Sequence, residues 1–120
     1  MRWEDVLKRN DIIGGDIETQ EGDDAYRGPL SGIKLENGLV RFESPWMAKR
    51  EGGMRGDGKW KNWPINTCFV NAKECPPRDI GNGRIQFNMS FLGFGVIFPK
   101  GGSKLDPSKV EGLQLTETTT

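Results

Sequence analysis

Apolar and polar residues alternate with a period of two on both sides of the dipeptide Asn37-Gly38. The apolar positions of this pattern are Ile33, Leu35, Val40 and Phe42. Asn-Gly suits the positive φ angles of a two-residue type I′ turn. With that turn as the loop, Leu35 lies opposite Val40 and Ile33 opposite Phe42, so all four side chains share one face. The pattern predicts a β-hairpin over residues 31–43.

A second alternating pattern runs from Ile85 to Phe98. Its apolar positions are Ile85, Phe87, Met89, Phe91, Phe94, Val96 and Phe98. A tight turn at Leu92-Gly93 pairs Phe91 with Phe94, Met89 with Val96 and Phe87 with Phe98, all on one face. Because Leu-Gly is not a favoured two-residue loop, a bulged or longer turn is the alternative, and we expect the shared face to survive it.

The apolar residues of these two hairpins are the predicted core, because burial of a Phe- or Leu-sized side chain contributes about 1.5–3 kcal/mol. At the N-terminus, Trp3, Val6 and Leu7 share one face at helical spacing and predict a short docking helix. Weaker elements are three strands and one helical turn, expected at residues 13–19, 65–70, 110–115 and 106–109 respectively.

Six or seven short strands, separated by many of the 17 glycines and 7 prolines, predict a mainly β fold. We expect a small antiparallel barrel or rolled sheet with a short N-terminal α-helix. The closing stretch, a hairpin followed by Asp106-Pro107-Ser108-Lys109 and a last strand, resembles the end of an SH3-like barrel. Residues 1–115 are interpreted as one domain, and residues 116–120 as a flexible C-terminal tail.

The charges balance, with 17 Lys plus Arg and 17 Asp plus Glu, so no overall field draws the chain to nucleic acid or to an anionic membrane. Residues 1–24 are acidic, and we interpret them as a solvated edge near a basic loop. The stretch from Asp16 to Asp24 offers oxygen donors that suit Ca²⁺, but it lacks the EF-hand order. A charged strand edge entering an acidic loop is the preferred interpretation.

Histidine is absent, which removes the side chain most used for proton transfer near neutral pH. Cys68 and Cys75 are expected to be two thiols, with Cys68 in the core. A short disulfide is the second interpretation, and a zinc site completed by carboxylates the third. We therefore expect no cofactor and no metal. The uncharged run from Ile85 to Pro99 is too short and too polar to span a bilayer, and the N-terminus lacks an apolar signal region, so a cytoplasmic location is expected.

The segment 46–63 holds three of the four tryptophans, five bases and many glycines, and we expect a long mobile loop. The candidate ligand-binding residues are Trp46, Lys49, Arg50, Arg55, Lys59, Trp60, Lys61 and Trp63. Indoles and guanidinium groups dominate protein interfaces, and aromatic rings interleaved with bases also suit single-stranded nucleic acid. The structural alternative is that the tryptophans fold back and cap the barrel.

Catalytic patterns are incomplete. Residues 53–59 match the start of a phosphate-binding loop, but Trp60 stands where the Mg²⁺-binding Ser or Thr belongs. The tripeptide Arg55-Gly56-Asp57 is too short to carry weight. Candidate nucleophiles have no histidine partner, and no Gly-x-Ser-x-Gly elbow occurs. The sequence favours a non-catalytic module that holds a protein or peptide partner; the alternatives are a single-stranded nucleic-acid binder and a small-ligand binder or enzyme with its site in the barrel mouth.

Overall fold

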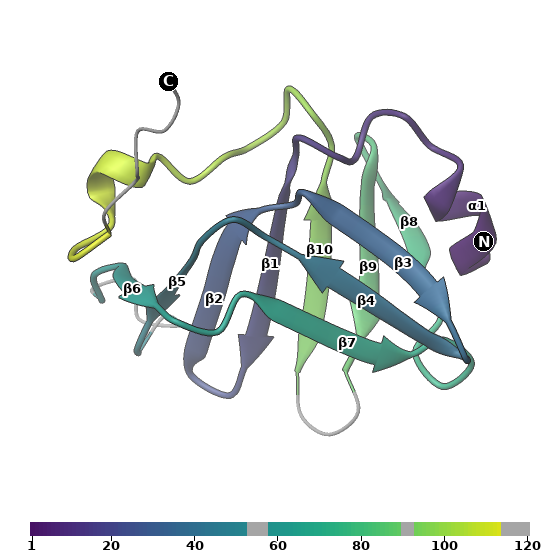
Figure 1. Cartoon of the computed structure of the whole chain (residues 1–120), viewed down its shortest axis with the longest axis horizontal. Coiled ribbons are helices and arrows are strands. Elements are labelled where there is room, and N and C mark those ends of the chain that lie inside the picture. The colour runs from purple at the N-terminus through teal and green to yellow at the C-terminus, as the bar shows by residue number, and fades with distance from the viewer. Residues whose placement is uncertain (53–57, 90–92, 114–120) are drawn as a thin grey trace.

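The computed structural model describes residues 1–52, 58–89 and 93–113. The protein is mainly β, with antiparallel sheets and one short helix, α1 (Trp3–Leu7), at the N-terminus (Figure 1). The strands of the described residues are β1 (Asp16–Glu21), β2 (Asp24–Pro29), β3 (Gly32–Glu36), β4 (Leu39–Glu43), β5 (Met47–Arg50), β6 (Lys61–Trp63), β7 (Thr67–Asn71), β8 (Arg78–Gly81), β9 (Arg84–Asn88) and β10 (Phe94–Phe98).

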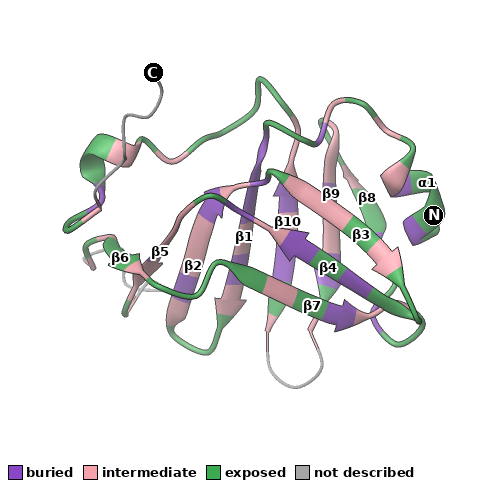
Figure 2. Cartoon of the chain, in the orientation of Figure 1, coloured by how far each residue is buried: buried purple, intermediate pink, exposed green. Residues whose placement is uncertain are grey.

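These strands form two sheets. The large sheet has seven strands in the order β6-β5-β2-β1-β10-β9-β8, and the small sheet has three in the order β3-β4-β7. The small sheet crosses in front of β1, β10 and β9, and burial follows the two facing surfaces (Figure 2). The described strands do not close into a barrel, and their two facing sheets are compatible with the predicted rolled sheet.

The first predicted hairpin is confirmed residue by residue. β3 pairs with β4 so that Ile33 lies opposite Phe42 and Leu35 opposite Val40. Asn37 and Gly38 have φ angles of 52° and 78°, the left-handed values that the turn requires. Local turn chemistry was therefore sufficient to set this register.

The second predicted hairpin forms, but its register was wrong. Phe94 lies opposite Asn88, and Gly95 lies opposite Phe87, whereas we expected Phe87 to face Phe98. The shift is by an odd number of residues, so the alternate positions of β10 exchange faces. Gly95 and Ile97 face the core, while the residues predicted to be inward, namely Phe94, Val96 and Phe98, lie on the other face. Phe91 lies outside the described residues.

The cause of this register is the ring of Phe87. Its phenyl group occupies the space above Gly95, where a Cβ atom would overlap it. Phe87 also stacks on Phe42 of the small sheet, with centroids 5.2 Å apart. The pairing that places a glycine opposite this ring is therefore the pairing that allows the two sheets to meet.

The N-terminal helix is confirmed and closes one end of the core. Trp3 and Val6 are buried, and the Trp3 ring meets Phe42 and Phe87 edge-on at 5.8 and 5.4 Å between centroids. Its indole Nε1 donates to the carbonyl oxygen of Cys75 at 2.9 Å, which satisfies the one polar atom of the ring. Cys68 and Cys75 are free thiols, but Cys75 is the buried one and Cys68 lies at the edge of the core.

Four strands were not predicted, namely β2, β5, β6 and β8. β8 is short and pairs with β9 through a second Asn-Gly turn, Asn82-Gly83, whose φ angles are also positive. The strands expected at residues 13–19 and 65–70 exist with shifted bounds, as β1 and β7. The strand expected from residue 110 was wrong over the described residues, where Glu111 forms only an isolated bridge with Lys61.

The segment after β10 is fastened across the outer face of the large sheet. Its predicted helical turn is confirmed at Pro107–Lys109, where the carboxylate of Asp106 accepts from the Ser108 amide. Asp16 is buried on β1 and accepts hydrogen bonds from Arg27 Nε at 2.9 Å and from the Leu105 amide at 2.8 Å. The acidic stretch therefore begins as a strand, as expected, and its first carboxylate anchors the C-terminal segment.

Candidate binding cavity between the two sheets

The segment 46–63 is not one long loop. It contains β5 and β6, which pair with each other at the edge of the large sheet, with residues 53–57 outside the described part. The expectation of a loop over its whole length was therefore wrong. The sequence pattern did not predict these two short strands, because the segment is rich in glycines and charged residues and the strands' apolar partners lie elsewhere in the chain.

The structure places the candidate ligand-binding residues on both faces of this edge. Trp46, Lys49, Arg50, Trp60 and Trp63 are half-buried. Lys59 and Lys61 are exposed, and Arg55 lies outside the described residues. Neighbouring strand residues point to opposite faces, so Lys49 and Arg50 diverge. The sheet therefore does not gather these side chains into one surface.

The half-buried bases lie against the protein's own aromatic rings. Lys49 Nζ lies 4.5 Å from the centroid of the Trp63 ring and 5.6 Å from that of Tyr26. On the other face, the Arg50 guanidinium lies 4.8 Å from the centroid of Trp60. Such cation–π contacts contribute about 0.5–1 kcal/mol at exposed sites. They hold the indoles in place, in agreement with the alternative in which the tryptophans fold back onto the sheet.

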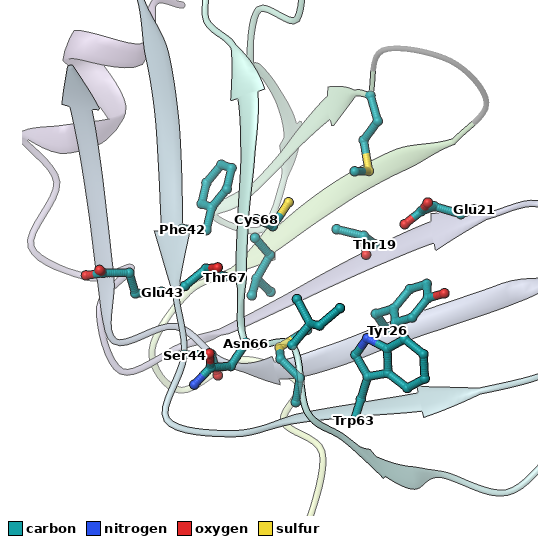
Figure 3. Close-up of a pocket in the computed structure, with 14 residues that line it drawn as sticks. Thr19, Glu21, Tyr26, Phe42, Glu43, Ser44, Trp63, Asn66, Thr67 and Cys68 are labelled. Atoms are coloured by element: carbon teal, nitrogen blue, oxygen red, sulfur yellow. The ribbon is translucent and has the colours of Figure 1, made fainter. Parts of the chain in front are cut away.

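A cavity of about 230 Å³ lies between the two sheets, next to this edge. Its walls come from β1, β2, β4, β5, β6 and β7, from the residues that precede β5 and β7, and from Met89 just after β9 (Figure 3). The apolar and aromatic lining residues are Ile17, Tyr26, Phe42, Met47, Trp63, Ile65, Cys68 and Met89. The polar ones are Thr19, Glu21, Glu43, Ser44, Asn66 and Thr67. Of the predicted site residues that the structure describes, the cavity includes Trp63 alone.

The aromatic wall of the cavity is positioned from behind. The rings of Tyr26 and Trp63 are 5.6 Å apart between centroids and are tilted by 57°. Lys49 covers both rings, and its ammonium lies 3.8 Å from the Asp24 carboxylate. On neighbouring strands, Tyr26 lies directly opposite Lys49, and Trp63 lies opposite Met47, two residues before Lys49. The pairing of these strands therefore sets the spacing of the three side chains.

Two carboxylates line the cavity but do not converge. Glu21 and Glu43 lie at opposite ends of it (Figure 3). Glu43 forms an ion pair with Arg41 at 3.6 Å. A general acid and base pair needs both groups within reach of the same substrate bond, and this arrangement does not provide that.

Cys68 is the nucleophile candidate of the cavity, and its environment opposes ionisation. Burial, together with the negative charge of Glu21, raises the pKa of the Cys68 thiol to about 11. The thiolate is the reactive form of cysteine. At neutral pH, Cys68 therefore presents a neutral, weakly polar surface to the cavity.

The sequence did not predict that five residues would line one cavity, namely Thr19, Tyr26, Ser44, Cys68 and Met89. Alternation along residues 17–21 indicated that Ile17, Thr19 and Glu21 share a face, which was the available signal. The remaining walls come from strands that are remote in the sequence.

Comparisons with protein-family models, with curated proteins and with solved structures found no match to this chain. Within the described residues, no group of three or more Cys, Asp or Glu is placed to hold a metal ion. No helix of that same part of the chain has the length and apolar character needed to cross a membrane.

Proposed function

We propose that this protein is a non-catalytic binding module whose ligand site is the cavity between the two sheets. The observation that carries the proposal is the cavity itself, an apolar and aromatic space with a few polar groups at its margins. Binding sites for small apolar groups have this composition. The site is thus the mouth between the sheets, and the segment 46–63 contributes one aromatic wall.

The cavity volume indicates the size of the ligand. Sites that enclose drug-sized molecules measure about 300–1,000 Å³, whereas an apolar cavity of about 150 Å³ holds a benzene ring. At about 230 Å³, this cavity suits one aromatic or branched aliphatic group. The neutral thiol of Cys68 and the separation of Glu21 from Glu43 favour binding over catalysis.

The bases weigh against a nucleic-acid site. A protein that binds single-stranded nucleic acid needs Lys or Arg side chains that follow the phosphates, and aromatic rings on which the nucleobases stack. In this protein, Lys49 lies against Tyr26 and Trp63, and Arg50 lies against Trp60. A nucleobase that stacked on these rings would have to displace the lysine and arginine side chains that already cover them.

Indole is the probe that tests the proposal, because it is neutral and smaller than the cavity. In a titration followed by two-dimensional amide NMR, we expect saturable shifts around Thr19, Cys68 and Met89. The substitution Thr19→Phe fills the cavity from a buried lining position and is expected to weaken binding at least about tenfold. Gln20→Phe is the matched control, since the next residue of β1 points to the other face.

Equal affinity of the two variants, each shown to be folded by its near-ultraviolet circular dichroism, would refute the cavity as the site. The absence of saturable shifts up to the solubility limit of indole would do the same.

A further inference from the structure

The two sheets of the described residues have four edges, and three of them are protected against pairing with another strand. Beyond β6, the Asn62 amide donates to the Glu111 carbonyl, and the Glu111 amide donates to the Trp60 carbonyl. β8 carries Arg78 and Asp79 and is irregular after Asp79. β3 carries Lys34 and Glu36, and α1 packs against it. Charges, bulges and covering segments are the usual devices that prevent edge pairing.

The fourth edge, β7, has none of these devices among the residues that the structure describes. Its sequence Thr-Cys-Phe-Val-Asn contains no charged residue and no proline. Phe69 is 62% exposed, and Ile65, just before the strand, is 59% exposed. An uncharged edge with exposed apolar groups is the type of edge to which an extended segment adds.

The backbone of β7 presents hydrogen-bonding groups on its open side. The Ser44 amide donates to the Asn66 carbonyl, and the Ala72 amide donates to the Gly38 carbonyl, both in register with the pairing of β4 and β7. Because antiparallel pairs alternate, the even-numbered residues of β7 bond to β4. The amide and carbonyl groups of Thr67 and Phe69 therefore point away from it, and among the described residues they have no backbone partner there.

The large sheet forms a floor beside this edge. The lower ends of β1 and β2 extend past β7 in Figure 1, and Thr67 and Cys68 line the cavity together with Thr19 and Tyr26. A single strand added to β7 would lie over the cavity mouth. A second folded copy that paired through its own β7 would have to bring its own large sheet into the same layer, whereas a single extended segment brings only one strand. A single segment is therefore the occupant that needs the least space at this edge.

The register of an added strand determines which of its side chains enters the cavity. A residue opposite Cys68 would point inward, as Cys68 does, and its neighbours opposite Thr67 and Phe69 would bond to β7 and point outward. The inward residue would meet Thr19 and Tyr26. A cavity that holds one side chain matches the inward position opposite Cys68.

Charge complementarity adds a second feature. Glu21 is exposed at the cavity and forms no ion pair within the described part of the chain. It follows Ile17 and Thr19 on the inward face of β1. A basic side chain two residues from the apolar one, on the same face of an added strand, would be directed toward this carboxylate.

We propose that the partner of this site is an extended peptide segment that adds to β7 as a further strand, with an apolar side chain in the cavity and a basic side chain two residues away facing Glu21. This inference rests on the proposed function, because it names the ligand of the same cavity. Backbone pairing supplies affinity, and the two inward side chains supply specificity.

The probe is the peptide Ac-Thr-Lys-Thr-Leu-Thr-Lys-Thr-NH2, whose leucine and two lysines share one face. Its symmetrical pattern fits β7 in either direction. In an amide NMR titration, we expect saturable shifts at Thr67, Cys68, Phe69 and Thr19. Solvent exchange of the Thr67 and Phe69 amides is expected to slow by at least about tenfold at saturation, because both become hydrogen-bonded.

The matched control is the same peptide N-methylated at the two threonines that flank leucine. This change removes the donors directed at β7 and keeps every side chain. We expect binding to weaken at least about tenfold. Equal binding of the methylated peptide, or no binding of the parent peptide, would overturn the inference. If indole still binds in either case, the proposed function stands and only the peptide is excluded.

Two protein variants test the edge and the charge separately. Phe69→Pro removes a donor that faces away from β4 and is expected to abolish peptide binding while indole binding persists. Glu21→Lys is expected to weaken the lysine peptide and to restore binding when both lysines are replaced by glutamate. Failure of this charge exchange, with Glu21→Lys folded and binding indole, would refute the role of Glu21.

Discussion

At the scale of single residues, the contact between Phe87 and Gly95 joins the two sheets. The phenyl ring lies over the glycine of β10 and stacks on Phe42 of β4, so it belongs to both layers. Trp3 closes the same cluster from the N-terminal helix. One position without a side chain therefore allows three aromatic rings to pack at the centre of the molecule.

Gly95→Ala is expected to lower the free energy of unfolding by about 1–3 kcal/mol, because its Cβ would overlap the Phe87 ring. Urea unfolding followed by tryptophan fluorescence measures the change. In a double-mutant cycle with Phe87→Leu, the cost of the alanine should shrink, since the smaller side chain leaves room for it. An unchanged cost in the Phe87→Leu background would show that the ring is not the cause.

The sequence predicted Phe87 as a core residue but not its partner. Both hairpins have alternating apolar residues, and the difference between them lies in the turn. Asn37-Gly38 specifies a two-residue loop, whereas Leu92-Gly93 leaves the loop length open. Without a specified loop, alternation alone placed Phe94 inward. The cross-strand contact with the Phe87 ring selected Gly95 instead.

At the scale of elements, Asp16 and Arg27 fasten the C-terminal segment to the large sheet. Arg27 donates to Asp16 on β1 and to the Ser103 carbonyl, and its guanidinium lies 4.4 Å from the centroid of the Phe98 ring. Asp16 accepts in turn from the Leu105 amide. An arginine on one strand thus connects β2, β1, β10 and the segment that follows β10.

Asp16→Ala is expected to destabilise the protein by about 3 kcal/mol, because it removes one partner of a buried, hydrogen-bonded ion pair. Glu18→Ala is the control, since Glu18 pairs with the same arginine from a more exposed position and should cost less than about 1 kcal/mol. Thermal or urea unfolding measures both. The Leu105 amide should also exchange faster in Asp16→Ala alone, and equal effects of the two variants would contradict the anchoring role.

The elements that could be predicted from the sequence are those whose own residues form a recognisable local pattern. The N-terminal helix has its apolar face, and the turn at Pro107–Lys109 has its capping aspartate. β5 and β6 have no such signal, because they are short strands that depend on pairing with β2 and with each other. Their existence is a consequence of the sheet to which they are added.

At the scale of the whole molecule, the cavity influences how stability depends on pH. The pKa of the Cys68 thiol is raised to about 11 in the folded protein, whereas in the unfolded chain it returns to its ordinary value of about 9.0. The unfolded state therefore loses its proton first. The stability that this thiol contributes is complete below about pH 9.0 and falls as the pH rises toward about 11.

The expected loss across this range is about 2–3 kcal/mol. It is measured by urea unfolding at a series of pH values, and the matched variant is Cys68→Ala, which has no thiol to titrate. The difference in stability between the wild type and Cys68→Ala should narrow as the pH rises. A constant difference would mean that the thiol ionises equally in both states. Lysine and tyrosine titrations occur in both proteins and cancel.

Local sequence is sufficient for the parts of this protein in which a few neighbouring residues specify their own geometry. The Asn37-Gly38 turn sets the register of one hairpin, and the spacing of Trp3 and Val6 sets the buried face of the helix. The antiparallel β class follows from the same short-range patterns.

The cavity and the open β7 edge arise only when remote strands meet. Thr19, Tyr26 and Cys68 come from three strands of two sheets, and their proximity depends on how the small sheet crosses the large one. Alternation states which residues share a face of a strand, but it does not state which face another sheet will cover. Long-range packing settles that question, because the stacking of Phe42 on Phe87 fixes the position of one sheet over the other.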